Sequence, residues 1–418
     1  MRILITSHNL IERGNYFRAL KIAGFLASRG HDVTFMPSSY RWYKPKKYMV
    51  GAVGVIESPS WSFVIGIDDG WSPVGTVYRI WTSLRRKYDI VYGFSHKPVD
   101  FLPAWFARTF RRSFYITDWC DWWGKGGLFE NIKYFRRHDM RLSWIKKMIL
   151  AAYDRVEALF EEFVPRRADF ITVICHALYK RAHTIGVKEK NLLLLVSGAD
   201  TENIQPMNKT SARERIGLNK ISDDWREMSL LGYTANYHLD EDFLLDAFSR
   251  VCRARPDVRM LVVGAEFRQS EEKMKNWGLK IFNAAGSGCL TPEHNIIHFG
   301  RRPFRDMGAF LGACDILLLP MTDNVYNRGR WPHKIGDYLA AGRPIIASDV
   351  GDTPLLLRGR DVGYIARPDA ADFAEKTIQL LSEREKWETF GANARNLAET
   401  ELNWERLGEL LYERIRER

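Results

Sequence analysis

The chain has 418 residues, enough for two domains of roughly 200 residues each, and its 46% hydrophobic content is typical of a soluble globular protein. The formal net charge is +11, and residues 1–205 carry the excess, with 31 Lys and Arg against 19 Asp and Glu. No uncharged apolar run reaches the roughly 18 residues of a membrane span, and Arg2 opens a strand rather than a secretory leader. The sequence therefore predicts a cytoplasmic protein whose first half faces an acidic partner.

The five cysteines are scattered, without a Cys-x-x-Cys pair or a zinc-like spacing to histidine. We expect reduced thiols and no metal site. These residues are Cys120, Cys175, Cys252, Cys289 and Cys314.

Apolar strands and amphipathic helices alternate along the first half. Residues 1–7 read as a strand, 16–30 as a helix that ends at Gly30, and 31–36 as a second strand. A strand, helix, strand unit of this kind makes the two strands parallel. Further apolar runs predict strands at 89–94, 113–118, 169–174 and 191–196.

A polar stretch at 208–228 separates these elements from a second series. Near-continuous apolar runs without alternation are typical of strands covered by helices on both faces. They predict strands at 229–234, 259–264, 295–300, 315–320 and 344–349, and helical patterns follow at 371–399 and 404–418. The expected fold class is α/β with two doubly wound domains, 1–205 and 206–400, and a C-terminal helix at 401–418 that packs back on the first domain.

The stretch "NRGRWPHKIGDYLAAGRPIIASD" (327–349) places Arg328, Arg330 and Lys334 ahead of an apolar helix. We expect this helix to begin at Pro332, with Lys334 and Asp337 on one face. Cations there oppose the helix dipole, so an anion such as a diphosphate is the expected partner, and Asp337 suits ribose hydroxyls. The alternative is a surface helix with a Lys334–Asp337 ion pair.

The sequence lacks the motifs of several common classes of enzyme. The loop "HNLIERGN" after the first strand offers only Gly14 in place of a Gly-x-Gly-x-x-Gly, which argues against a nicotinamide cofactor. No Gly-x-x-x-x-Gly-Lys loop and no serine nucleophile elbow is present. We therefore expect no cofactor and no metal.

At the C-terminal half, "WPHKIGDYLAAGRPIIASDVGDTPLLL" (331–357) and residues 362–395 resemble family 4 glycosyltransferases of the GT-B fold. In the N-terminal half, 14–35 is similar to that family's glycine loop and first helix, and 171–206 to the end of its first domain. The resemblance implies two Rossmann-like domains with a cleft between them. It also implies a retaining, metal-independent transfer of sugar from a nucleotide-diphosphate donor, with the acceptor on the N-terminal domain.

In the second half, the resemblance assigns a role to some residues, but at other family positions this chain has a different residue. The family's ribose-binding acid falls on Asp337, but the acid that contacts the donor sugar falls on Gly329. The Arg and Lys that clamp the diphosphate fall on Tyr233 and Leu239. The expected substitutes for this missing charge are Arg328, Arg330 and Lys334.

In the first half, "TDWCDWW" (117–123) resembles the place where related enzymes have a His followed by an Asp. Cys120 takes the His position and Asp121 keeps the Asp. Asp118 and Asp121 are expected to orient or deprotonate an acceptor hydroxyl; alternatively they cap the following loop. The remaining predicted substrate-binding residues are Gly14, Asn15, Gly264, Gly300, Arg301 and Gly351.

The basic residues of the first half accompany aromatic ones at 103–114 and 131–153. A helix at 131–153 could lie on an anionic membrane surface, which predicts a peripheral protein at its inner face. The alternative is a helix packed on the domain with its cations extended to solvent. No nucleic-acid recognition motif accompanies these residues.

The leading prediction is a glycosyltransferase acting on a saccharide or lipid-linked acceptor in surface polysaccharide or glycolipid synthesis. Because the family's Glu, Arg and Lys positions are substituted, a nucleotide-sugar-binding scaffold without turnover is the alternative. A sugar-nucleotide epimerase of the same fold is a third reading, and it would need more acid and base residues facing the sugar.

Overall fold

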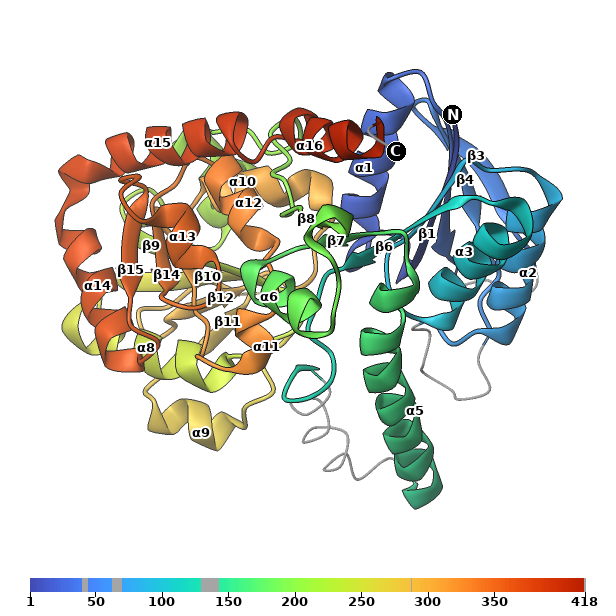
Figure 1. The fold of residues 1–418 in the computed structure, drawn as a ribbon. Helices are drawn as coiled ribbons and strands as arrows, with labels where there is room; N and C mark the ends of the chain where they lie inside the picture. The colour runs from blue at the N-terminus through green and yellow to red at the C-terminus, as the bar shows by residue number, and fades with distance from the viewer. Residues whose placement is uncertain (40–43, 62–69, 129–142, 287, 417–418) are drawn as a thin grey trace. The chain divides into compact units, whose positions relative to one another are not determined.

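The computed structural model describes residues 1–39, 44–61, 70–128, 143–286 and 288–416, and the chain divides into two compact units (Figure 1). Unit 1 comprises Met1–Ser197, Arg328–Trp331 and Trp404–Arg418, and unit 2 comprises Gly198–Asn327 and Pro332–Asn403. Each unit has its own mainly parallel sheet, which confirms the predicted α/β class.

The described residues of unit 1 form an eight-stranded sheet with helices around it (Figure 1). The strands are β1 (Arg2–Leu10), β2 (Asp32–Ser38), β3 (Lys46–Val50), β4 (Val53–Glu57), β5 (Ile90–Gly93), β6 (Phe114–Trp119), β7 (Phe170–Val173) and β8 (Leu192–Leu194). The helices are α1 (Tyr16–Ser28), α2 (Pro73–Arg85), α3 (Pro98–Arg111), α5 (Trp144–Phe163), α6 (His176–Thr184) and α16 (Trp404–Arg416).

The strand order of unit 1 is β3-β4-β2-β1-β5-β6-β7-β8. β1 pairs in parallel with β2 on one side and β5 on the other, so the direction in which the chain adds strands reverses at β1. Only β3 runs antiparallel to its neighbour within this sheet's described strands. The sequence did not predict the β3–β4 pair, because β3 reads KKYMV, is largely exposed and lacks a continuous apolar run.

α16 is part of unit 1 although the chain reaches it from unit 2. Figure 1 shows it meeting α1 at a crossing, and its buried Leu407, Leu411 and Ile415 join the same hydrophobic core as Phe25. The two helices approach so closely that a Cβ on Gly408 would lie 2.3 Å from the Phe25 ring. A glycine at this position allows the contact.

The described residues of unit 2 form a seven-stranded sheet in the order β11-β12-β10-β9-β13-β14-β15. The strands are β9 (Ser229–Ala235), β10 (Val258–Gly264), β11 (Ile281–Asn283), β12 (Ile296–His298), β13 (Ile316–Leu319), β14 (Ile345–Ser348) and β15 (Gly363–Ala366). The helices are α7 (Lys209–Arg215), α8 (Glu241–Ala254), α9 (Glu271–Asn276), α10 (Met307–Gly312), α11 (Val325–Arg328), α12 (Lys334–Ala340), α13 (Thr353–Leu357), α14 (Ala370–Ser382) and α15 (Trp387–Thr400).

In the second sheet the strand order reverses at β9, which pairs in parallel with β10 on one side and β13 on the other. Buried side chains of α8 and α14 form one core with strand residues such as Leu231 and Met260. α14 begins at a capping residue, Asp369, whose carboxylate accepts a hydrogen bond of 2.8 Å from the amide of Asp372.

Three expectations need correction or fall outside the described residues. The helix expected from Pro332 begins at Lys334, after the residue His333 in the N-cap position. The helical pattern at 371–399 is two helices, α14 and α15, separated by a 3-10 turn at Arg384–Lys386. Of the predicted helix 131–153, residues 131–142 lie outside the described ranges, and α5 begins at Trp144.

Within the described ranges, no helix combines the length and apolar character needed to cross a bilayer.

Candidate functional site

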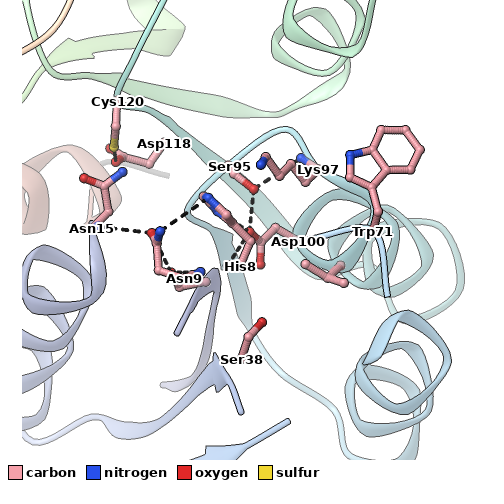
Figure 2. Close-up of polar contacts among 12 residues, drawn as sticks. His8, Asn9, Asn15, Ser38, Trp71, Ser95, Lys97, Asp100, Asp118 and Cys120 are labelled. Carbon is pink, nitrogen blue, oxygen red and sulfur yellow. Dashed lines mark hydrogen bonds and ion pairs between the residues drawn. The ribbon is translucent and has the colours of Figure 1, made fainter. Parts of the chain in front are cut away.

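The carboxyl ends of parallel strands meet at one edge of a sheet, and ligands of doubly wound sheets bind where the strand order reverses. In unit 1 this point lies between β1 and β5, so the loops that follow these two strands are the place to look (Figure 2). In unit 2 it lies between β9 and β13.

A buried polar cluster occupies this point in unit 1. Asp100 accepts hydrogen bonds from the amide of His8 (2.9 Å), the hydroxyl of Ser95 (2.5 Å) and the guanidinium of Arg79 (2.8 Å). Burial alone would raise the pKa of Asp100, but the hydrogen bond from His8 and the charge of Arg79 hold it below its ordinary value. This carboxylate therefore ties the end of β1 to the loop after β5.

The β1 loop also holds two of the predicted residues. The side-chain oxygen of Asn9 accepts a hydrogen bond of 3.1 Å from the amide of Asn15 (Figure 2). Gly14 has φ +52°, and a Cβ there would lie 2.5 Å from the Asn9 amide nitrogen. Gly14 therefore provides both the backbone conformation and the space that the loop requires.

Asp118, at the end of β6, is 1% exposed and paired with the buried Arg18. Its two oxygens lie 3.0 and 3.1 Å from the Arg18 guanidinium, and it also accepts hydrogen bonds from Thr172 and the Cys120 thiol. The predicted contact of Asp118 with an acceptor hydroxyl does not fit this placement, because its oxygens are occupied inside the protein. Burial raises the pKa of Cys120 well above its usual range, so this residue stays a thiol.

Asp121 lies just beyond β6 and is half-buried. It forms an isolated β-bridge with Arg330, and the amide of Trp122 donates a hydrogen bond of 3.0 Å to the carbonyl of Gly329. Burial raises the pKa of Asp121 to about 7, against the opposing effect of the Arg330 charge. A carboxyl group with this pKa exchanges protons near neutral pH, as a general base must.

The backbone after Asp121 is held by a buried carboxylate on α5. Glu161 accepts hydrogen bonds from the amides of Trp123 (2.7 Å) and Gly124 (2.8 Å) and forms an ion pair of 3.0 Å with Arg181. Desolvation raises the pKa of Glu161, and the Arg181 charge opposes this rise. The loop that carries Asp121 is therefore fixed from the helix beside it.

In unit 2, Lys334 and Tyr233 meet at the reversal point. Tyr233 lies near the end of β9, and the Lys334 ammonium lies 4.3 Å from the centre of its ring. Asp337 lies one helical turn further along α12. Burial and the charge of Asp200 raise the pKa of Asp337 to about 7, and Lys334 opposes the rise.

His238, in the loop after β9, was not predicted. Its ring stacks on Tyr233 and Phe267, with centroids 5.7 and 4.5 Å away, and its Nε2 donates to the carbonyl of Ala265 at 2.6 Å. Burial lowers the pKa of His238 to about 4, so the ring is neutral at pH 7. It is buried beside the Lys334–Tyr233 pair, where it supports the Tyr233 ring.

The other predicted residues of unit 2 lie at the same edge of the sheet. A Cβ on Gly264 would lie 1.8 Å from the carbonyl oxygen of Ala235, so only glycine fits where β9 and β10 end. Its amide donates a hydrogen bond of 2.9 Å to the carbonyl of Gly300, and the side chain of Arg301 is exposed. Gly351, with φ +61°, follows β14.

The structure thus distributes the predicted residues over both units. Gly14, Asn15, Asp118, Asp121, Arg328 and Arg330 belong to unit 1, and Gly264, Gly300, Arg301, Lys334, Asp337 and Gly351 to unit 2. The described residues contain no group of three or more His, Cys, Asp or Glu side chains suited to a metal ion. The residues that the sequence did not single out are His8, Asn9, Ser95, Lys97, Asp100, Glu161 and His238.

Known proteins resemble this chain both in sequence and in fold. Residues 230–383 match the family described as "Glycosyl transferases group 1". A GDP-mannose-dependent monoacylated alpha-(1-6)-phosphatidylinositol monomannoside mannosyltransferase of Corynebacterium glutamicum is 24% identical over 250 residues, which span 58% of this chain and 61% of that enzyme. The chain therefore covers about three fifths of this relative.

Solved structures match over nearly their whole length. Sucrose-phosphate synthase from Thermosynechococcus elongatus has a TM-score of 0.73 at 14% identity, covering 100% of this chain and 98% of that one. HepE from Anabaena, in complex with UDP and glucose, has a TM-score of 0.68 at 14% identity and covers 100% of both chains. The chain therefore has the GT-B fold of these solved structures, and its residues 230–383 are similar to the group 1 glycosyltransferases.

Proposed function

We propose that the protein is a retaining glycosyltransferase that moves a sugar from a nucleotide-diphosphate donor to a saccharide or lipid-linked acceptor. Unit 2 binds the donor at the reversal point between β9 and β13. The observation that carries this proposal is Lys334, whose ammonium lies 4.3 Å over the ring of Tyr233, the position where the resemblance to family 4 calls for an arginine.

The charge of Lys334 suits a diphosphate. As the glycosidic bond breaks, negative charge develops on the leaving diphosphate, and a fixed cation stabilises it without further reorganisation. Asp337 accepts hydrogen bonds from ribose hydroxyls. Arg328 and Arg330, which the sequence grouped with Lys334, belong to unit 1 and are not assigned to the unit 2 site. The relatives support a nucleotide donor, since one is named as GDP-mannose-dependent and another was solved with UDP.

Unit 1 provides the acceptor side. Asp121, with a pKa near 7, is the group that orients the acceptor hydroxyl and takes its proton. Gly14 and Asn15 bring the β1 loop close to the substrates, and the Asp100 network holds that loop in place. Asp118 is a positioning residue that fixes β6 through Arg18.

The donor contact is tested by replacing Lys334 with Ala. We expect UDP or GDP binding to weaken by about 1 to 3 kcal/mol, the usual value of a hydrogen bond to a charged group. Lys220→Ala is the matched control, because Lys220 is an exposed lysine of unit 2 in the 3-10 turn Leu218–Lys220. Isothermal calorimetry measures both variants, and equal affinities for them would refute the donor contact.

A binding protein without turnover is the second candidate. It is favoured by Gly329, Tyr233 and Leu239, which stand where the family has an acid, an arginine and a lysine. A panel of nucleotide sugars separates the two, since a transferase releases the nucleoside diphosphate and a scaffold binds the donor unchanged. Conversion of the donor sugar to its epimer without an acceptor would instead identify an epimerase.

An anionic membrane is the proposed further partner of unit 1, which would make the protein peripheral at the inner face of the membrane. Trp144, Ile145 and Met148, in the first two turns of α5, are 70%, 52% and 63% exposed. Phe110 of α3 is 67% exposed and followed by Arg111 and Arg112. Exposed aromatic groups beside cations suit the interface of an anionic bilayer.

A further inference from the structure

A cavity of about 870 Å³ opens at the amino-terminal edge of the unit 1 sheet, opposite the candidate site. Its lining includes Phe114 at the start of β6, Asp169 just before β7 and Asn191 just before β8. Since these strands are parallel, the cavity and the carboxyl-end loops lie at opposite ends of the same strands. β6 has six residues, which corresponds to a separation of about 20 Å.

Five cationic side chains from separate parts of the chain line this cavity. Arg108 comes from the last turn of α3, Arg112 from its C-cap, and Arg166 from the 3-10 turn Pro165–Arg167. Lys188 and Lys190 come from the connection between α6 and β8. Segments far apart in the sequence thus bring like charges to one hollow.

The positive charge is only partly balanced within the cavity. Asp169 is the one carboxylate among the described residues that line it. Its oxygens lie 2.8 and 3.0 Å from Nε of Arg108, and it also accepts a hydrogen bond of 3.0 Å from the amide of Tyr115. Asp169 is therefore committed to Arg108 and to the backbone of β6, and it does not pair with Arg112, Arg166 or Lys188.

We propose that this cavity is a second anion-binding site, for a ligand that carries at least two adjacent phosphate groups. Converging cations repel one another in a concave site, and a multiply charged anion removes that repulsion while forming charge-assisted hydrogen bonds. The volume lies in the range of pockets that hold small ligands. The sugar donor is not the ligand of this cavity, because in the proposed function the donor binds to unit 2.

The ligand phosphates can come from a soluble molecule or from a lipid headgroup. Inorganic pyrophosphate probes the first source. Vesicles of phosphatidylcholine with diacylglycerol pyrophosphate, whose headgroup is a diphosphate, probe the second.

The test variant is Arg166→Gln with Lys188→Gln, and the matched control is Lys47→Gln with Lys87→Gln. The control residues are exposed lysines of unit 1 outside the cavity, so both double variants lose the same charge. Both are made in a Lys334→Ala background, which weakens the proposed diphosphate contact of unit 2. Pyrophosphate binding to the cavity is thus measured separately from binding to the proposed donor site.

Calorimetry with pyrophosphate should show binding that is about tenfold weaker in the cavity variant and within about twofold of the parent in the control. Hydrogen–deuterium exchange in the parent should show protection by pyrophosphate at 108–114, 165–169 and 186–191. Vesicle binding that is lost in the cavity variant alone, and displaced by pyrophosphate, would support the site with a lipid source. Equal pyrophosphate and vesicle binding by the two double variants would overturn the proposal.

Discussion

Arg18 and Asp118 form a buried charge pair beneath the candidate site of unit 1. Both side chains are fully buried, and Arg18 also donates to the carbonyls of Leu195 and Val196, each at 2.7 Å. These bonds join α1, β6 and the end of β8. The pair therefore fixes the strand from which the Asp121 loop extends.

Removing one partner of this pair should be costly. We expect Arg18→Gln to lower the free energy of unfolding by about 3 to 5 kcal/mol, because Asp118 is left as an uncompensated buried charge. Arg29→Gln is the control from the same helix. Arg29 pairs with Glu405 at the surface, with side chains 39% and 70% exposed, and its loss should cost less than about 1 kcal/mol. Urea unfolding measures both, and similar losses would contradict the structural role of Asp118.

Asp121 should show its role in the pH dependence of transfer. With a pKa of about 7, the carboxyl group keeps its proton in the folded chain between about pH 4 and 7, where the unfolded chain has lost it. The unfolded state then binds fewer protons, so this group makes stability fall as pH rises through that window. The base form increases over the same window, so the transfer rate should rise toward pH 7 and above.

Asp121→Asn removes the base and should lower the transfer rate by about 10² to 10⁴-fold while donor affinity stays within about twofold. The rise in rate near pH 7 should disappear with it. Steady-state kinetics across pH, together with donor calorimetry, measure these effects. A parallel loss of folding stability with unchanged transfer by the folded fraction would mark Asp121 as structural.

The sequence singled out the candidate residues unevenly, and the reason is physical. Lys334 and Asp337 were predicted because cations ahead of an apolar helix favour an anionic partner. His8, Asn9, Ser95 and Asp100 have no such local signal: they matter because β1 lies next to β5, and strand order is set by long-range pairing. The rule that ligands bind where strand order reverses would have found them once that order was known.

At the scale of the elements, α5 holds two loops of the candidate unit 1 site in place. Its inner side carries Glu157 and Glu161, four residues apart and therefore on one face. Glu157 accepts a hydrogen bond of 2.5 Å from the Trp71 indole and lies 3.3 Å from the Lys97 ammonium, and Glu161 holds the loop after β6. One helix thus positions the loops that follow two strands.

Glu161→Gln should loosen the loop at 119–127. We expect a loss of about 2 kcal/mol in the free energy of unfolding and faster amide exchange across the loop, because a neutral amide binds the two backbone N–H groups and Arg181 less strongly. Glu189→Gln is the control, since Glu189 is 69% exposed and forms its ion pair with His183 rather than with a residue of 119–127. Unchanged exchange at 119–127 would contradict the role given to Glu161.

Several of the strands that the sequence predicted have a near-continuous apolar run that is buried on both faces. β1, β9 and β13 are examples. β11 and β15 are short and only partly buried, so their residues carry little of that pattern. The start of α12 was predicted two residues early because Pro332 favours a first helical turn, but in this chain it precedes the N-cap.

For the molecule as a whole, the chain passes between the two units four times, at 197–198, 327–328, 331–332 and 403–404. The last passage brings α16 onto α1 and completes the core of unit 1. Leu411 is fully buried there, whereas its neighbour Leu410 is 40% exposed.

Leu411→Ala should therefore destabilise unit 1 by about 2 to 5 kcal/mol through the lost burial and the cavity it leaves. Leu410→Ala, which removes the same atoms one position earlier, should cost less than about 1 kcal/mol. Chemical denaturation with amide exchange at α1 distinguishes the two variants. Equal stabilities would mean that α16 does not contribute to this core.

The position of α16 also affects how the protein is made. Domains usually fold in the order in which they leave the ribosome. Here every residue of unit 2 is translated before residues 404–416, so the unit that begins the polypeptide is the later one to finish folding. Until then the apolar surface of α1 that receives Leu407, Leu411 and Ile415 stays uncovered on the nascent chain.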